Sequence, residues 1–263
     1  MKMIAVVVMM VSLLFADPGV TKENVLEWLA NSTGFEQNLG QVSDFDGNPV
    51  NDVYTRLNLG EFSIFLTEKG ASFVIYKSEN SDENQSSPSN PSPPATRSPL
   101  PMNYARFDLE LLNSEIRKEN IVYEDELPGY TNHYYPFCPD GILFVKSYRK
   151  LRIKEIYPEI DWAFRIEDGR LHHEFEILPS ANYEDIKLKV KWADLIVAED
   201  GKRIRFKTPP GEIVDGELFA YEENNPPGIQ ASYRKIADDI IGFEIKDFSG
   251  KGRLIIDPPL SLL

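Results

Sequence analysis

Three carboxylate residues, Asp161, Glu174 and Glu176, lie in two alternating stretches on either side of the dipeptide Asp168-Gly169. Asp-Gly between alternating apolar and polar residues predicts a β-hairpin with a two-residue turn. With that turn, Asp161 stands directly opposite Glu176, and Glu174 is its diagonal neighbour on the same face. Because a slip of one residue would move every side chain to the other face, this register is well specified. The sequence therefore predicts a sheet face on which carboxylates gather.

Carboxylates that face one another across two strands can do chemistry. Like charges placed opposite each other lower stability, so such a pair is either solvated or used. One use is to hold a divalent cation, since hard ions prefer oxygen ligands. Another is to share the acid and base roles in glycoside cleavage, for which the carboxyl groups stand about 5 to 9 Å apart. The simplest interpretation, which we favour, is a face whose ordinary charges spread into water.

The opposite face of the same hairpin is predicted to be apolar and to face the core. His173 falls on that face beside Phe164, whereas His172 falls on the carboxylate face, because adjacent residues of a strand point in opposite directions. The sequence has no HExxH or CxxC spacing, no GxSxG elbow and no glycine loop for phosphate. We expect no metal and no cofactor. The predicted core pairs are Ile166 with Leu171, Phe164 with His173, Trp162 with Phe175, and Ile160 with Ile177.

A second candidate group is aromatic. Tyr130 and Tyr134 lie on either side of Asn132, and Tyr135 follows them directly. Aromatic rings that carry a polar tip can form a platform for sugars. The same rings also serve as buried anchors of a loop, and this is the interpretation that we favour.

A basic strand face is predicted further along the chain. Three lysines alternate there with apolar residues: Lys187, Lys189 and Lys191 with Ile186, Leu188, Val190 and Trp192. Alternation places the lysines on one face and Trp192 on the other, with the apolar residues. The basic face could meet the acidic face of a neighbouring strand or an anionic glycan. A plain solvent face, or a charged edge that discourages aggregation, is the interpretation that we favour.

The elements that must position these groups are strands. Residues 62–66 and 72–76 flank Glu68-Lys69-Gly70 and predict a hairpin, and residues 105–111 alternate as a half-buried strand does. Many short strands joined by turn signals predict an all-β fold, with a β-sandwich-like architecture of two sheets. Further strands are predicted at 142–148, 160–166, 171–178, 186–192, 195–198, 204–208, 218–221, 231–236, 240–248 and 253–256.

The remaining segments are organised around this single all-β domain, which we expect to span residues 17–263. One short amino-terminal helix is predicted from Thr21 to Gly34 by apolar residues at three-to-four spacing. Residues 79–101 are rich in Ser, Pro and Asn with almost no apolar side chains, so we expect a disordered, low-complexity insertion there.

The start and the charge of the chain bear on its location. Residues 1–16 combine Lys2, an apolar run and a small residue at the end, which predicts a secretory signal peptide. No second long apolar segment follows, so we expect no membrane insertion of the mature chain. The formal net charge is -14, which argues against nucleic acid as a partner, because that binding depends on Lys and Arg. The single cysteine, Cys138, excludes an intramolecular disulfide.

Several phrases occur in an order that resembles one known group of proteins. This order is similar to the amino-terminal domain of large bacterial surface proteins that continue into SBBP-type β-propeller repeats, often with a type IX secretion sorting tail. The resemblance implies an all-β fold and an extracellular context rather than a chemistry. Glu159 and Ser180 stand where that group usually has Gly, which suggests altered turns. The phrases are FEQNLGQV at 35–42, YTNHYYP at 130–136, YPEID at 157–161, LHHEFEILPSA at 171–181 and LIIDPPL at 254–260.

From these observations we expect a non-catalytic extracellular module, structural or adhesive, at the start of a bacterial cell-surface or secreted repeat protein. Its expected partners are downstream β-propeller repeats of the same polypeptide and an extracellular glycan or protein. Two alternatives stay open. One is a secreted polysaccharide hydrolase that uses Asp161, Glu174 and Glu176. The other is a carbohydrate-binding module that uses the tyrosines.

Overall fold

A computed structural model of the chain describes residues 33–44, 46–60, 62–78, 102–167, 170–223, 225–257 and 259–262. Within these ranges the chain forms β-strands and two single 3-10 turns, and no α-helix. The elements are β1 (Phe35–Gln37), β2 (Val53–Asn58), β3 (Phe62–Thr67), β4 (Gly70–Ser78), β5 (Met102–Leu111), η1 (Lys118–Asn120), β6 (Ile121–Glu126), β7 (Thr131–Tyr135), β8 (Cys138–Val145), β9 (Ser147–Tyr157), β10 (Ile160–Glu167), β11 (Arg170–Ile177), η2 (Tyr183–Asp185), β12 (Leu188–Lys191), β13 (Asp194–Val197), β14 (Ile204–Lys207), β15 (Glu212–Asp215), β16 (Phe219–Glu222), β17 (Asn225–Ala237), β18 (Ile240–Lys246), β19 (Leu254–Asp257) and β20 (Pro259–Leu262).

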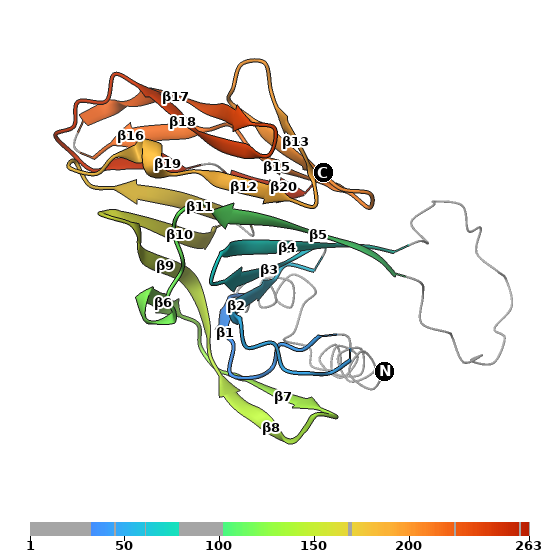
Figure 1. The fold of residues 1–263 in the computed structure, drawn as a ribbon. Coiled ribbons are helices and arrows are strands. Elements are labelled where there is room, and N and C mark those ends of the chain that lie inside the picture. The colour runs from blue at the N-terminus through green and yellow to red at the C-terminus, as the bar shows by residue number, and fades with distance from the viewer. Residues whose placement is uncertain are drawn as a thin grey trace, which may run out of the picture.

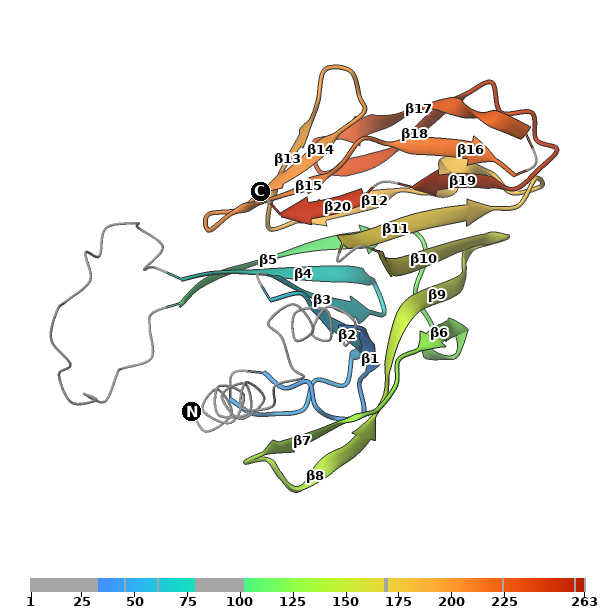
Figure 2. The ribbon, with the colours of Figure 1, turned by 180° about the vertical axis from the view of Figure 1, so that it is seen from behind.

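The strands pair in a closed antiparallel barrel (Figures 1 and 2). The closed path runs β1–β2–β3–β4–β5–β12–β18–β17–β16–β19–β11–β10–β9 and returns to β1. Among the described residues this ring holds 13 strands. β6 adds to β9, and β13, β14 and β15 reach the ring through β20, which pairs with β11.

The predicted two-sheet sandwich is therefore wrong, although the all-β class is right. A sandwich leaves the edges of its two sheets unpaired, whereas here β5 pairs with β12 on one side and β1 with β9 on the other. Alternation of apolar and polar residues is the same in both architectures, because each strand buries one face in either case. Only the long-range pairings distinguish them.

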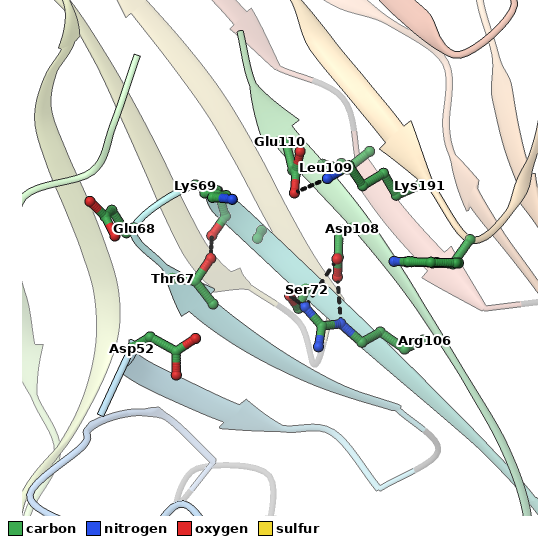
Figure 3. A pocket seen from close by; sticks show the side chains of 13 residues that line it. Asp52, Thr67, Glu68, Lys69, Ser72, Arg106, Asp108, Leu109, Glu110 and Lys191 are labelled. Carbon is green, nitrogen blue, oxygen red and sulfur yellow. Dashed lines mark hydrogen bonds and ion pairs between the residues drawn. The ribbon is translucent and has the colours of Figure 1, made fainter. Parts of the chain in front are cut away.

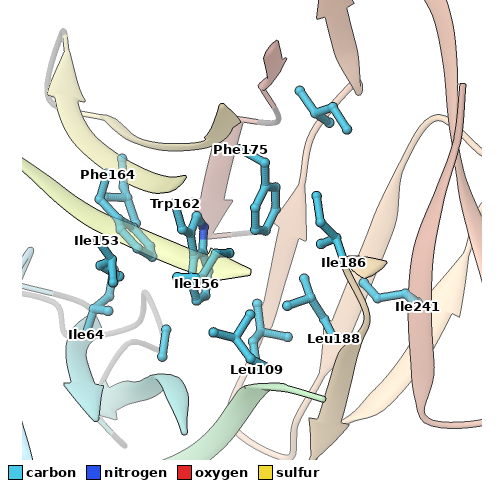
Figure 4. Packing of buried hydrophobic residues seen from close by; sticks show 14 of the residues in the cluster. Ile64, Leu109, Ile153, Ile156, Trp162, Phe164, Phe175, Ile186, Leu188 and Ile241 are labelled. Carbon is cyan, nitrogen blue, oxygen red and sulfur yellow. The ribbon is translucent and has the colours of Figure 1, made fainter. Parts of the chain in front are cut away.

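One continuous core fills the interior (Figure 4). Trp162, Phe164 and Phe175 are almost fully buried at its centre, as the register of the β10–β11 hairpin predicts. The rings of Trp162 and Phe175 stack 5.4 Å apart. Aromatic pairs of this kind contribute stability beyond their buried area. The inward-facing residues of the β10–β11 hairpin are thus part of the buried core of the barrel.

The predictions of single strands and hairpins are more accurate than the prediction of the overall architecture. The hairpin at 62–76 is confirmed as β3–β4, with Thr67 opposite Gly70 across the turn, and the strand at 105–111 is confirmed as part of β5. The expected helix from Thr21 lies almost entirely outside the described residues, as do the signal peptide and the insertion at 79–101. The Asp168-Gly169 turn also lies outside them, but Glu167 pairs with Arg170 on either side of it.

One hairpin stands apart from the barrel. β7 and β8 form a two-stranded sheet of their own, which in Figure 1 lies at the opposite end of the molecule from β17 and β18. It carries the candidate tyrosines, whereas the candidate carboxylates lie on the wall of the barrel itself.

Candidate functional site

The carboxylate face forms in the predicted register. Asp161 on β10 pairs with Glu176 on β11, and Ala163 pairs with Glu174. The pairing prediction is therefore confirmed. β9 flanks β10 on one side and β19 flanks β11 on the other, so residues from four strands meet on this part of the outer wall.

Glu176 is held between two arginines. Its side chain is only 8% exposed, so its charge needs a partner within the protein. Arg152 of β9 contacts one carboxylate oxygen through Nη1, and Arg253, just before β19, donates to the other at 2.8 Å. Both oxygens of Glu176 are thus engaged by guanidinium groups, which are the strongest carboxylate partners among side chains.

Asp161 belongs to the same network. Its Oδ1 accepts a hydrogen bond of 2.9 Å from the backbone N–H of Glu155, and its Oδ2 lies 3.7 Å from Nη1 of Arg152. Nε of Arg152 donates to Glu124 on β6 at 3.1 Å. Burial lowers the pKa of Arg152, but Glu176 and Glu124 more than reverse that shift, so its pKa is raised. One guanidinium therefore contacts three carboxylates, two of which have a second cationic partner, Arg253 for Glu176 and Lys150 for Glu124.

Glu174 has its own arginine. Nη1 of Arg165 donates to Glu174 at 2.6 Å, and Nη2 donates to Asp257 of β19 at 2.8 Å. Burial is the largest influence on Glu174 and raises its pKa; Arg165 lowers the pKa and the charges of Asp257 and Glu176 raise it, so that the pKa lies above its ordinary value. The surroundings of Glu174 therefore disfavour its ionised form, although Arg165 is paired with it.

This arrangement joins the strands of the wall through ion pairs. A glycosidase needs one carboxylic acid that protonates the leaving oxygen and a second carboxylate free to attack or to activate water. Here each of Asp161, Glu174 and Glu176 is paired with an arginine, so none of them is free of a cationic partner. A hollow of about 780 Å³ borders Asp161 and Glu176, and a ligand there would meet ion pairs already formed. Among the described residues, no group of three or more His, Cys, Asp or Glu could hold a metal ion.

The buried histidine has a partner that sequence reasoning missed. His173 packs beside Phe164 as predicted, with ring centroids 6.0 Å apart. Its Nδ1 accepts from Nε1 of Trp162 at 3.1 Å, and its Nε2 lies 3.2 Å from the buried carboxylate of Asp215. Asp215 lies two residues after the buried Ile213, so alternation along β15 could have placed it on the core face. The group is a satisfied polar network within the core.

The tyrosine hairpin is exposed. Tyr130 is 56% exposed, Tyr134 60% and Phe144 60%, so the favoured interpretation of buried loop anchors is wrong for Tyr130 and Tyr134. Tyr135 is half-buried and stacks on Phe137. The rings of Tyr130 and Phe144 meet edge to face, 4.8 Å apart. The Oδ1 atom of Asn132 accepts a hydrogen bond of 2.9 Å from the backbone N–H of Phe144 and is therefore not free for a ligand. Its role is to hold the two strands of the hairpin together.

Backbone geometry directs two of these rings. Phe144 has a positive φ of 59°, a conformation that bulky residues rarely adopt. A Cβ added at Gly141 would lie 2.6 Å from Cε1 of Tyr134, so glycine at this position leaves room for that ring against the backbone. The hairpin is therefore shaped to present aromatic rings, and no signal in the alternation of the sequence indicates it.

Polar contacts anchor the hairpin to the barrel. His133 of β7 is nearly buried, with Nε2 3.5 Å from Glu36 of β1 and 3.3 Å from Nη2 of Arg56 on β2. Arg56 pairs with Glu36 at 2.8 Å. Burial alone raises the pKa of Glu36, but His133 and Arg56 together bring it below its ordinary value. These contacts fix where the exposed rings stand.

The fold and these two surfaces define a closed all-β barrel with an internally neutralised charged face and an exposed aromatic hairpin. The chain belongs to the family described as a domain of unknown function, DUF7948, whose sequence profile matches residues 35–259. No curated protein and no solved structure matches the chain. Over the described part of the chain, there is no helix with the length and apolar character needed to cross a membrane.

Proposed function

We propose that this chain is a non-catalytic adhesive module of an exported bacterial protein, and that it binds an extracellular glycan through the β7–β8 hairpin. The observation that carries the proposal is the set of exposed aromatic rings on a hairpin that stands apart from the barrel, namely those of Tyr130, Tyr134 and Phe144. Exposed aromatic side chains gathered on one element commonly mark a binding surface, because rings offer a large contact area at low entropic cost.

The arginine pairing of the carboxylate face supports the non-catalytic part of the proposal. A hydrolase would keep at least one of Asp161, Glu174 and Glu176 free of cationic partners so that it could gain or lose a proton during the reaction. All three are paired instead. The hydrolase alternative therefore has little support from the geometry, whereas the carbohydrate-binding alternative merges with the adhesive role.

A printed array of extracellular polysaccharides and oligosaccharides tests the proposal. We expect the wild-type protein to be retained by a subset of the glycans and the Tyr134→Ala variant to lose at least about tenfold in affinity for them, as loss of a central aromatic contact does. Phe219→Ala is the matched control, because Phe219 is a similarly exposed ring on β16. Retention of no glycan, or equal retention of both variants, would contradict the proposal.

We also propose the larger context of the module. The order of phrases from residue 35 to residue 260 supports an amino-terminal domain followed by SBBP-type β-propeller repeats, in some relatives with a type IX sorting tail, and the apolar run of residues 3–15 supports export to the cell surface or medium. Reading the gene beyond codon 263 tests the first point. Absence of any repeat or sorting tail there would remove its main support.

A further inference from the structure

A second hollow, of about 340 Å³, lies on the outer wall of the barrel over β3, β4, β5 and β12 (Figure 3). It involves other strands than the β7–β8 hairpin and other residues than the carboxylate face. We call it the Trp192 groove. Its contacts combine fixed polar groups with one exposed aromatic ring, a combination found in sites for small polar ligands.

The middle of the Trp192 groove is a preformed hydrogen-bonding surface. Arg106 binds Asp108 through two bonds, from Nε at 2.7 Å and from Nη2 at 3.0 Å. The same Nη2 donates to the hydroxyl of Ser72 on β4 at 3.1 Å. Asp108 and Ser72 are buried beneath the arginine, and Figure 3 shows all three side by side. The guanidinium plane is thus held in place from below.

The basic strand face supplies the next group. Lys191 of β12 donates to Glu110 of β5 at 2.7 Å, and Lys189 lies 3.4 Å from Asp239. Two of the three lysines of this face therefore meet acidic neighbours. The expectation of a charged edge is wrong, because β12 is paired on both sides, with β5 and β18. In the Trp192 groove the cations of Arg106 and Lys191 are already neutralised.

Trp192 completes the groove against the alternation of its strand. Alternation assigns it to the buried face with Leu188 and Val190, but its side chain is 74% exposed. The cause is a positive φ of 65° at Trp192 itself, which turns the residue out of the strand pattern. A left-handed backbone is unfavourable for a bulky residue, and such strain gathers at functional positions. An indole ring that is 74% exposed gains little from burial that would offset this cost.

We propose that the Trp192 groove binds a neutral saccharide. The apolar face of a sugar ring would stack on the indole, while its hydroxyls would donate to Glu110 and accept from Arg106. Neutral ligands are favoured because Arg106 and Lys191 are paired, and because the remaining cation of the lining, Lys69, is outnumbered by two further carboxylates, Asp52 and Glu68. The net charge of -14 further repels anionic polysaccharides. The proposal goes beyond the role of the hairpin and does not depend on it.

Titration with hexasaccharides tests the proposal. The probes are the hexaoses of cellulose, xylan, mannan and laminarin, with oligogalacturonate as the anionic control. We expect at least one neutral probe to shift the tryptophan emission of the full chain to the blue, because an exposed indole becomes covered. Trp162 is fully buried and gives no such response. The third tryptophan, Trp28, lies outside the described residues and is the same in wild type and variant, so the comparison with Trp192→Phe assigns the shift. The shift should vanish in Trp192→Phe.

Calorimetry with the same probe separates a ring contact from other effects. We expect Trp192→Phe to keep the affinity within about threefold and Trp192→Ala to lose at least about tenfold. Phe219→Ala and Tyr134→Ala should leave the affinity unchanged, so failure of the hairpin proposal would not affect this result. The proposal is overturned if no neutral hexaose shifts the emission, if only oligogalacturonate binds, or if Trp192→Ala binds as the wild type does.

Discussion

On the wall formed by β10 and β11, charged side chains are bound to one another, whereas on the β7–β8 hairpin aromatic side chains face solvent. Glu176 is nearly buried between Arg152 and Arg253, and Tyr134 is more than half exposed with its ring against Gly141. Both surfaces attract attention in the sequence. Only the hairpin leaves its groups available to a partner.

The comparison shows how to weigh such clusters. Charges on a sheet surface are satisfied by neighbouring strands whenever an opposite charge is within reach, and the neighbours come from far along the chain. An exposed aromatic ring has no equivalent of an ion pair within the protein. It loses contact area that burial would have provided, so a group of them signals an external contact more reliably than a group of carboxylates does.

The largest expected effect concerns the stability of the carboxylate face. Arg152→Ala leaves Glu176 buried with one guanidinium instead of two, and breaking a buried ion pair of this kind costs about 3 kcal/mol of unfolding free energy. Lys154→Ala, an exposed residue of the same strand, should cost less than about 0.5 kcal/mol. Urea denaturation of both variants measures the difference. Equal stabilities would show that the network is superficial.

Glu36, which anchors the β7–β8 hairpin, and Glu174, on the carboxylate face, should affect the pH dependence of stability in opposite directions. The pKa of Glu36 is lowered, so its ionised form stabilises the fold above its ordinary pKa of 4.5, and this contribution disappears as the pH falls through the lowered value. The pKa of Glu174 is raised, so its ionised form is unfavourable at pH 7, and this cost disappears as the pH falls towards 4.5.

Glutamine at each position tests these signs by urea denaturation across the pH range. We expect Glu36→Gln to be less stable than the wild type at pH 7, and Glu174→Gln to be at least as stable. Both differences should shrink towards zero in acid. Curves in which Glu174→Gln loses the most stability at pH 7 would mean that the pairing with Arg165 outweighs the burial of the carboxylate.

A smaller effect is expected on the hairpin. Phe144 has a left-handed backbone, a conformation that asparagine adopts more easily than phenylalanine does. Phe144→Asn should leave the unfolding free energy unchanged or raise it by up to about 1 kcal/mol, because the strain that it relieves exceeds the lost contact with Tyr130. Thermal unfolding measures this. A marked loss of stability would show that Phe144 is held for the fold and not for a partner.

Local features of this fold could be predicted from the sequence. The β3–β4 hairpin and the register of β10 with β11 follow from turn residues and alternation, and they correctly bring Asp161 opposite Glu176. The strand β9 was harder to recognise, because the segment from Ser147 to Tyr157 carries many Lys, Arg and Glu residues among its apolar ones.

Features that depend on distant residues could not be predicted. Closure of the barrel requires β1 to meet β9 and β5 to meet β12, and alternation contains no information about partners. The same holds for Arg253, which reaches Glu176 from 77 residues away. The exposure of Trp192 could not be predicted for another reason. Its left-handed backbone conformation reverses the face on which its side chain lies.

The smallest expected effect tests the central claim most directly, namely that the carboxylates are structural and the module is not a hydrolase. Wild type and Asp161→Asn are incubated with the polysaccharides retained on the array, and released reducing ends are quantified. We predict that neither protein releases products, that both bind equally, and that Asp161→Asn costs less than about 1 kcal/mol of stability. Product release by the wild type that disappears in Asp161→Asn would contradict the account.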